Sequence, residues 1–299
     1  MSSIAVKDVE VTNSLIWFRN DLRINDHPGI NSALSISGKV IGFYCFNSSM
    51  FKMTNLGFPK IDKFRAKFLL ETIENLKEDL KKINVTLIIK IGDPVEELTK
   101  IISQQKIKNI FFQKEWTQEE VDEENQLKSK CNDKNFKSFY SQFLYDPDDL
   151  DINNISNVFT NFRKHCEKKL KVKDLVESPK KLLDDNLLKD DYLIPSLSDL
   201  GLEDFEMDSR SAFKFKGGCN AAKERLDFYF WQSKKINFYK QTRNGLIGQD
   251  YSSKFSSWLS NGSISAREIF WEIKDYEKNI LKNQSTYWLI FELIWRDFF

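Results

Sequence analysis

Short β-rich runs alternate with longer amphipathic stretches through the first half of the chain. The runs rich in branched and aromatic residues occupy positions 14–18, 40–46, 86–91, 109–112 and 136–143. Residues 62–83 place apolar side chains at a helical spacing, and helix-start signals precede 94–102 and 118–130. Strands separated by helices of this length favour a parallel sheet covered on both faces. The pattern predicts an α/β fold for residues 1–145.

The pattern changes twice after residue 145. Residues 146–212 are rich in Asp, Lys, Asn, Ser and Leu without sustained periodicity, which is typical of a long linker, with one short helix predicted at 158–169. From residue 213 the chain becomes helical and aromatic. Its strongest helical stretches are 220–230, 265–281 and 287–299. We therefore expect three parts: a domain at 1–145, a linker at 146–212 and a helical region at 213–299.

The composition is that of a globular protein and argues against several classes. Hydrophobic residues make up 41% and charged residues 30%, with a net charge of +1. No run approaches the ~20 apolar residues of a membrane span, and residues 1–13 do not resemble a secretory signal, so we expect a cytoplasmic protein. Four scattered cysteines and two histidines indicate free thiols and no metal site. No glycine-rich dinucleotide fingerprint follows the first strand.

Charge is distributed unevenly around the predicted linker. Residues 160–182 carry eight bases against three acids, and residues 184–208 carry nine acids against one base. Such runs are usually solvated faces, and we interpret them in that way.

Two C-terminal segments carry residue types suited to a ligand. Tyr239 and Arg243 share a helix face at i, i+4, and the hydroxyl-rich run 251–256 precedes an apolar helix start. Hydroxyls and free N–H groups at a helix start can hold a phosphate, although an ordinary serine N-cap would give the same pattern.

The last helix carries a mixed stripe. Its members, spaced i, i+3, i+4 and i+7, are Glu292, Trp295, Arg296 and Phe299. Aromatic surface beside a carboxylate and a guanidinium suits a flat, polar-edged ligand such as a nucleobase. The alternative is a buried helix with one internal ion pair.

Several phrases occur along nearly the whole chain in a fixed order. They are WFRNDLRIND at 17–26, VFTNFRK at 158–164, FKGG at 215–218, TRNGLIG at 242–248, DYSSKFS at 250–256, and STYWL at 285–289 leading to ELIWRDFF at 292–299. Together they resemble the photolyase/cryptochrome family, and most of all its DASH-type cryptochromes. The DASH assignment depends mainly on the VFTNFRK phrase and on the Arg-Asn-Gly-Leu run.

This resemblance implies an N-terminal α/β domain that seats an antenna pigment, typically a folate such as 5,10-methenyltetrahydrofolate, and a helical domain that binds FAD. Members are blue-light flavoproteins that split cyclobutane pyrimidine dimers in DNA, as deoxyribodipyrimidine photo-lyases, or sense light. The DASH type is expected to prefer dimers in single-stranded DNA.

The resemblance also assigns roles by position. Flavin contacts are expected from Tyr239, Ser252, Ser253, Lys254, Phe255, Ser256 and Leu289. Glu292 and Trp295 are expected to face the dimer. Arg243, Arg296 and Phe299 are expected at the DNA, although the family often has tyrosine at the position of Phe299.

The family's flavin domain continues for about as long again as the helical region of this sequence. The resemblance therefore implies a truncated chain with an incomplete FAD site. Other hypotheses are a non-catalytic or partner-binding fragment and an α/β domain that keeps only the antenna pigment. The sequence leaves the oligomeric state and the choice between repair and light sensing open.

Overall fold

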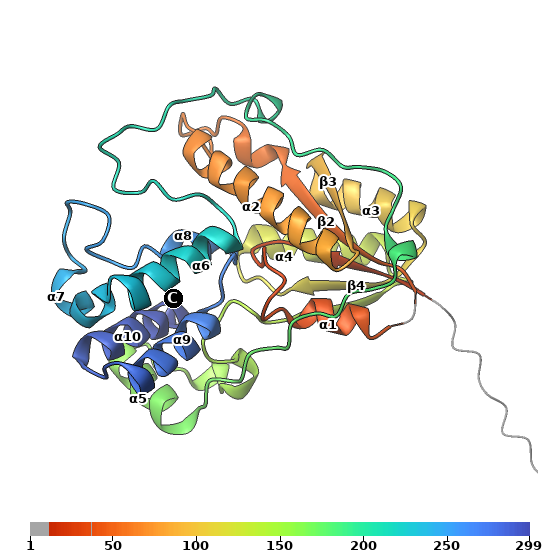
Figure 1. Cartoon of the computed structure of the whole chain (residues 1–299). Helices are drawn as coiled ribbons and strands as arrows, with labels where there is room; N and C mark the ends of the chain where they lie inside the picture. The colour runs from red at the N-terminus through yellow and green to blue at the C-terminus, as the bar shows by residue number, and fades with distance from the viewer. Residues whose placement is uncertain (1–11, 37) are drawn as a thin grey trace, which may run out of the picture.

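A computed structural model describes residues 12–36 and 38–299, so residues 1–11 of the predicted first domain lie outside it (Figure 1). Its sheet has five parallel strands in the order β3-β2-β1-β4-β5. The strands are β1 (Asn13–Trp17), β2 (Val40–Asn47), β3 (Thr86–Gly92), β4 (Ile107–Gln113) and β5 (Asn135–Phe139). The predicted α/β fold is confirmed.

Four helices cover the two faces of this sheet. They are α1 (Pro28–Leu34), α2 (Lys63–Lys82), α3 (Pro94–Gln104) and α4 (Gln118–Lys130). Alternate residues of β1 point to opposite faces, so that Ile16 joins the core under α1 and α2, whereas Leu15 and Trp17 join the core under α3 and α4. The sequence pattern did not predict α1, which has only seven residues and is capped by the His27 ring accepting from the Ile30 N–H at 3.1 Å.

The regular elements after β5 are all helices. The α-helices are α5 (Phe159–Lys169), α6 (Cys219–Asp227), α7 (Tyr239–Thr242), α8 (Ser256–Asn261), α9 (Ala266–Asn279) and α10 (Gln284–Phe298). A π-helical turn, Phe228–Gln232, extends α6, and a 3₁₀ turn, Lys235–Phe238, precedes α7. Residues 217–299, all of them described, contain no strand, which confirms the predicted change of architecture.

The segment between α5 and α6 lies on the α/β part of the molecule. Leu197 and Leu200 are buried in the core under α2. The buried amide of Asn186 donates to the carbonyls of Val40 at 2.9 Å and Asn84 at 2.6 Å, and it accepts from the Val40 N–H at 2.8 Å. This long segment therefore crosses the domain as a strap with its own buried contacts.

The loop after β1 joins the sheet to the helices. The buried Arg23 donates to the carbonyls of Ser141 and Gly262, both at 3.0 Å. The buried carboxylate of Asp26 accepts from Ser265 at 2.7 Å and pairs with Arg267 at 2.8 Å. Removing one partner of such a buried pair typically costs about 3–5 kcal/mol, because the other charge is left uncompensated. These bonds hold α8 and α9 against the edge of the sheet where β1 ends.

Candidate functional site

Helices α7 and α10 bring four of the expected site residues together. Arg243 Nη1 lies 2.8 Å from Glu292 Oε1, and each side chain is 29% exposed. Tyr239 lies beside this pair and is 7% exposed, and burial together with the Glu292 charge raises its pKa to about 12. Leu289, one turn before Glu292, is 3% exposed. The cluster therefore offers a guanidinium–carboxylate pair at the surface above a buried, neutral phenol.

The ion pair of this cluster joins two helices and does not run along α10. Arg296 donates instead to the carbonyls of Gln142 and of Leu259, the latter at 3.2 Å, and burial lowers the pKa of its guanidinium. One of these carbonyls follows β5 and the other lies in α8, and together they hold the Arg296 guanidinium away from Glu292. The four residues that the sequence places in one stripe therefore do not form one cluster. These contacts favour a structural role for Arg296, and its contact with DNA stays a prediction.

The aromatic members of the stripe form a stack. The Trp295 ring lies 3.5 Å from that of Phe159 on α5, at an interplanar angle of 14°, and 5.4 Å from that of Phe299 at 13°. Phe299 is 95% exposed. Parallel rings of this kind offer a plane on which a base could continue the stack. The Trp295 ring, however, already packs against Phe159.

A buried arginine that the sequence analysis did not single out shapes the hydroxyl-rich loop. Arg225 of α6 pairs with Asp250 at 2.7 Å and donates to the carbonyls of Ser252 at 2.9 Å and Ser253 at 3.1 Å. Its guanidinium lies 4.9 Å from the Tyr229 ring centroid. A charge on the apolar face of an amphipathic helix is the signal that could have revealed it.

The loop ends at α8 without a serine cap. The N-cap position belongs to Phe255, which is buried in the helical core, and no side chain bonds to the helix start. Ser256 is exposed at the first helical position. Lys254 takes a left-handed conformation with φ of 65° and places Nζ 3.5 Å from the Tyr251 ring centroid. The alternative of an ordinary serine N-cap is thus wrong for this helix.

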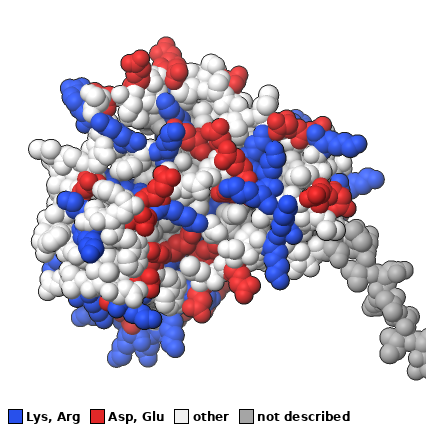
Figure 2. All heavy atoms as spheres, in the orientation of Figure 1, with Lys and Arg blue, Asp and Glu red and all other residues white. Residues whose placement is uncertain are grey.

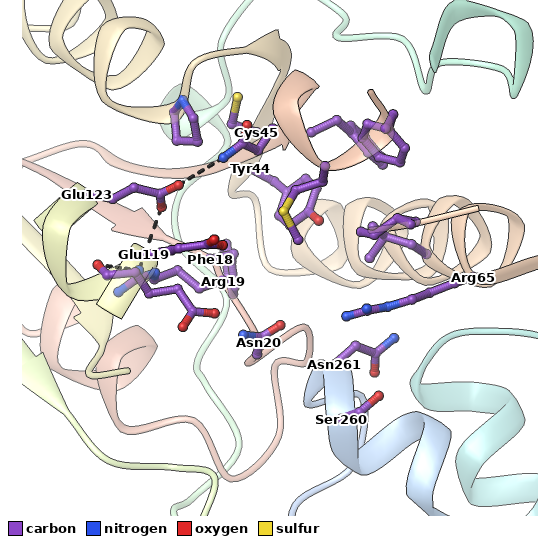
Figure 3. A pocket seen from close by; sticks show the side chains of 18 of the residues that line it. Phe18, Arg19, Asn20, Tyr44, Cys45, Arg65, Glu119, Glu123, Ser260 and Asn261 are labelled. Carbon is purple, nitrogen blue, oxygen red and sulfur yellow. Dashed lines mark hydrogen bonds and ion pairs between the residues drawn. The ribbon is translucent and has the colours of Figure 1, made fainter. Parts of the chain in front are cut away.

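A cavity of about 270 Å³ lies where β1 and β2 end, between α2, α4 and α8 (Figure 3). Polar side chains that line it include Arg19, Asn20, Tyr44, Arg65, Glu123 and Asn261. The carboxyl edge of a parallel sheet is where α/β folds bind ligands. The sequence analysis did not predict this cavity, although the polar residues that directly follow β1 were a usable signal.

Arg19 is the most informative residue of the cavity. It is buried, lies over the Trp17 ring at 4.5 Å, and donates through Nη2 to the Glu120 carbonyl at 2.8 Å. Its Nη1 has no hydrogen-bond partner among the described residues. Burial raises the pKa of Glu123, 3.8 Å from the guanidinium, and raises that of the Cys45 thiol to about 12. The cavity is thus lined by a neutral thiol and by an arginine whose one unpartnered nitrogen is itself buried.

The described residues do not group three His, Cys, Asp or Glu side chains in a way that could hold a metal ion. None of their helices has both the length and the apolar character needed to cross a bilayer.

Comparisons with known proteins agree with this geometry. Residues 14–181 match the DNA photolyase family. Cryptochrome DASH of Gloeobacter violaceus is 42% identical over 95% of this chain and 58% of its own length, and that of Xenopus laevis is 38% identical over 94% and 55%. The chain belongs to the photolyase/cryptochrome family.

Solved structures support the fold of this family member. The crystal structure of the Synechocystis cryptochrome superposes with a TM-score of 0.90 at 38% identity, covering 96% of this chain and 60% of that one. A class III photolyase from Agrobacterium tumefaciens has a TM-score of 0.79 at 22% identity, over 99% and 60% of the two chains, and supports the fold alone. The chain thus spans somewhat more than half the length of the relatives that it matches.

Within this photolyase/cryptochrome chain, the structure sorts the expected site residues into three groups. Tyr239, Arg243, Leu289 and Glu292 meet between α7 and α10; Ser252 to Ser256 form the Arg225-ordered loop; and Trp295 with Phe299 forms the stack. Arg296 instead donates to the carbonyls of Gln142 and Leu259. The roles of these residues toward flavin or DNA stay predictions.

Proposed function

We propose that this chain functions as a DASH-type cryptochrome/photolyase, binding FAD and splitting cyclobutane pyrimidine dimers, mainly in single-stranded DNA, under blue light. The observation that carries the proposal is the Arg225-ordered serine loop, found in a chain whose relatives are named Cryptochrome DASH. A buried arginine that fixes the loop backbone leaves hydroxyls and N–H groups to a ligand.

The serine loop and the α7–α10 cluster would contact different parts of a flavin, and to different extents. Ser252 and Ser256, with the uncapped start of α8, supply donors suited to a diphosphate. Tyr239 and Leu289 are less than a tenth exposed, so they offer only their edges to a ring system. Bound FAD would supply light absorption and an electron, and this chain's own residues would hold and orient it. The fit therefore supports binding through the diphosphate, with weak contact to the ring.

The Arg243–Glu292 pair supplies the polar chemistry toward DNA. A phosphate that binds Arg243 competes with Glu292 for the guanidinium and frees the carboxylate to accept from a pyrimidine N–H. Trp295 and Phe299 lie further along the same helix, where a base could stack on them. This arrangement couples backbone contact to base recognition.

The test measures FAD binding and light-driven repair. FAD titrated into the chain should bind weakly, and Ser252→Ala with Ser256→Ala should weaken it further, while Ser260→Ala, an exposed serine at the other end of α8, should not. With FAD and a reductant, blue light should restore thymine absorbance in a dimer-containing single strand. Bound FAD without light-dependent splitting would favour light sensing, and equal FAD affinity in all variants would contradict the proposed loop site.

The cavity at the sheet edge supports a second candidate function, which is binding of the antenna pigment. A folate offers carboxylates for Arg19 and Arg65 and a flat pterin ring for the aromatic wall that contains Tyr44. Arg65 is exposed and makes no hydrogen bond with the described residues, so Arg65→Ala should preserve the fold. We expect 5,10-methenyltetrahydrofolate to bind the wild type and to bind Arg65→Ala several-fold more weakly, with Lys130→Ala as control. Unchanged affinity in Arg65→Ala would place the pigment elsewhere.

A further inference from the structure

A patch of exposed apolar side chains lies beside the sheet-edge cavity and has no role in the sites described above. Residues 52–60 form a hairpin between β2 and α2, and large apolar side chains in it and at the start of α2 are each more than half exposed. They are Met53, Leu56, Phe58 and Phe64. A single exposed apolar residue is common on a protein surface, whereas four within twelve residues indicate an interaction site.

Hydrogen bonds fix the shape of this hairpin. The Phe58 carbonyl accepts from the Thr54 N–H at 3.1 Å and from the Thr54 hydroxyl at 2.6 Å, and Met53 and Pro59 form an antiparallel bridge. At the tip, Gly57 donates to the Thr54 carbonyl at 3.0 Å and has a φ of 84°. Apart from its chain neighbours, no atom of the described residues lies within 4 Å of the position that a Gly57 Cβ would occupy. The apolar side chains are therefore held in place before a partner binds, which lowers the entropy cost of association.

Residues of the strap enlarge this apolar surface. The Phe205 ring packs against the Phe64 ring with 4.5 Å between the ring centroids, and Met207, two residues further on, is exposed. The contact holds the strap against the start of α2. The apolar residues of the two segments, which we call the hairpin patch, are Met53, Leu56, Phe58, Phe64, Phe205 and Met207. Aromatic residues and methionine are enriched at protein interfaces, so the composition fits a contact with another protein chain.

Charged residues of both signs border the hairpin patch. The basic ones, from the hairpin and the first two turns of α2, are Lys52, Lys63 and Lys67. The acidic ones, from the strap, are Glu203, Asp204 and Glu206. None of these six side chains forms an ion pair within residues 12–36 and 38–299, whereas the neighbouring Lys60 pairs with Glu119. Asp62, which lies among the lysines, caps α2 by accepting from the Lys63 N–H at 2.7 Å.

The mixture of charges limits the kind of partner that fits. Figure 2 shows basic and acidic side chains mixed with uncharged surface at the upper side of the molecule, where Figure 1 places the start of α2. An anionic lipid surface would face the acids of the strap, and a strongly basic or acidic peptide would face like charges on one half of the border. In a second copy related by a two-fold axis, the lysines of each chain face the acids of the other and the apolar centres meet. The patch is therefore complementary to itself.

We infer that the hairpin patch is a homodimer interface, in which a second copy of this chain packs its patch against the first and pairs the lysines of each copy with the strap acids of the other. The base of the hairpin, formed by Met50, Phe51 and Ile61, lines the sheet-edge cavity, so the second copy stands beside the mouth of that cavity. The interface belongs to the sheet domain, and the inference depends on neither flavin nor DNA.

The first experiment measures the association of the purified chain by sedimentation at increasing concentration. The wild type should shift from the 35.2 kDa of one chain toward twice that mass. Leu56→Asp/Phe58→Asp should raise the dimer dissociation constant at least about tenfold, because the dimer would bury unpaired charges in its apolar centre. The matched control, Leu246→Asp/Ile247→Asp, changes two exposed apolar residues of the helical part and should dimerise like the wild type once thermal melting shows both variants folded. A monomeric wild type, or equal dimerisation in the hairpin variant and the control, overturns the inference.

The second experiment exchanges the charges. The variants Lys52→Glu/Lys63→Glu/Lys67→Glu and Glu203→Lys/Asp204→Lys/Glu206→Lys each place like charges opposite one another in the dimer, so each alone should be monomeric. An equimolar mixture of the two should dimerise, because both halves of the mixed interface then pair opposite charges. A mixture that stays monomeric overturns the two-fold pairing. The wild type is also mixed with phosphatidylserine vesicles, and a chain that binds them while it stays monomeric in solution would identify a lipid surface and overturn the dimer.

Discussion

The cavity at the sheet edge and the face formed by α7 and α10 use similar residues in different surroundings. The cavity is lined from several sides, by residues of β1, β2 and four helices, and Arg19 in its wall has one unpartnered, buried nitrogen. The α7–α10 face is bounded from one side, and its Arg243 pairs with Glu292 at the surface. An enclosed site is preformed for a ligand, whereas a one-sided face contributes orientation and little burial. The cavity therefore offers a small ligand contacts from more sides than the α7–α10 face does.

The largest expected effect on stability concerns the buried ion pair between Asp26 and Arg267, which connects the sheet domain to the helices. Asp26→Asn leaves Arg267 buried without its counter-charge, so the free energy of unfolding should fall by about 3–5 kcal/mol. Asparagine is chosen because residue 26 has a φ of 47°, a conformation that it tolerates. Urea denaturation measures the change. Asp208→Asn, which weakens an exposed ion pair with Arg210, is the control and should change stability little. Equal effects in the two variants would show that the buried pair does not stabilise the contact between the sheet domain and the helices.

Disordering the serine loop should affect the helical side alone. Arg225→Met removes the donors that fix Ser252 and Ser253 and leaves Asp250 unpaired, so we expect a loss of about 2–3 kcal/mol in stability and a further weakening of FAD binding. Lys223→Met, an exposed position on the same helix, is the control. Folate binding at the sheet edge should be unchanged in both variants. If Arg225→Met also abolishes folate binding, the two regions are not independent.

DNA-binding assays on two variants should distinguish base stacking from contact with the phosphate backbone. Trp295→Ala should weaken binding to dimer-containing single strands by about 1–3 kcal/mol and spare undamaged strands. Arg243→Ala should weaken both alike and reduce the salt dependence, because a phosphate contact carries no lesion information. A salt-titrated binding assay on both strands checks this. Equal loss on both strands in Trp295→Ala would mean that its stack with Phe159 is core packing.

A pH dependence of stability is also expected, and it is spread over several pH units. Burial raises the pKa of Asp297, which accepts from the N–H groups of Leu144 and Tyr145, to about 7. The folded chain then binds more protons than the unfolded chain between pH ~4 and ~7, so the free energy of unfolding should fall as pH rises through this window, by at most about 1.4 kcal/mol per unit. Asp297→Asn should flatten that slope in urea titrations at several pH values. An unchanged slope would assign it to other buried acids.

The strands and long helices were predictable because their apolar residues repeat with clear periods. Strand β5 was predicted to reach Phe143 but ends at Phe139, because the following aromatic residues leave the sheet and Tyr140 stacks with Trp116 at 5.6 Å. Helices α1 and α8 have too few residues to show a period. The domain boundaries at 145 and 212 stay predictions.

The residues of the site could be predicted from the sequence, but the residues that they contact could not. Glu292 and Arg296 have the spacing of an intrahelical pair, yet Glu292 pairs with Arg243. The choice between the two pairings depends on the positions of α7 and of the Gln142 carbonyl next to α10. These positions result from contacts between residues that are distant in sequence. The cavity was missed for the same reason, because its walls come from elements that lie far apart in the sequence.

The flavin content of the purified 299-residue chain after gel filtration tests most directly whether the helices present only one wall of a flavin site. We expect a protein that is colourless at flavin wavelengths or that retains only a small fraction of FAD, because Tyr239 and Leu289 are buried and the serine loop offers contacts from one side. A yellow protein that keeps near-stoichiometric FAD through the column would contradict this, and would mean that a second copy or another chain completes the site.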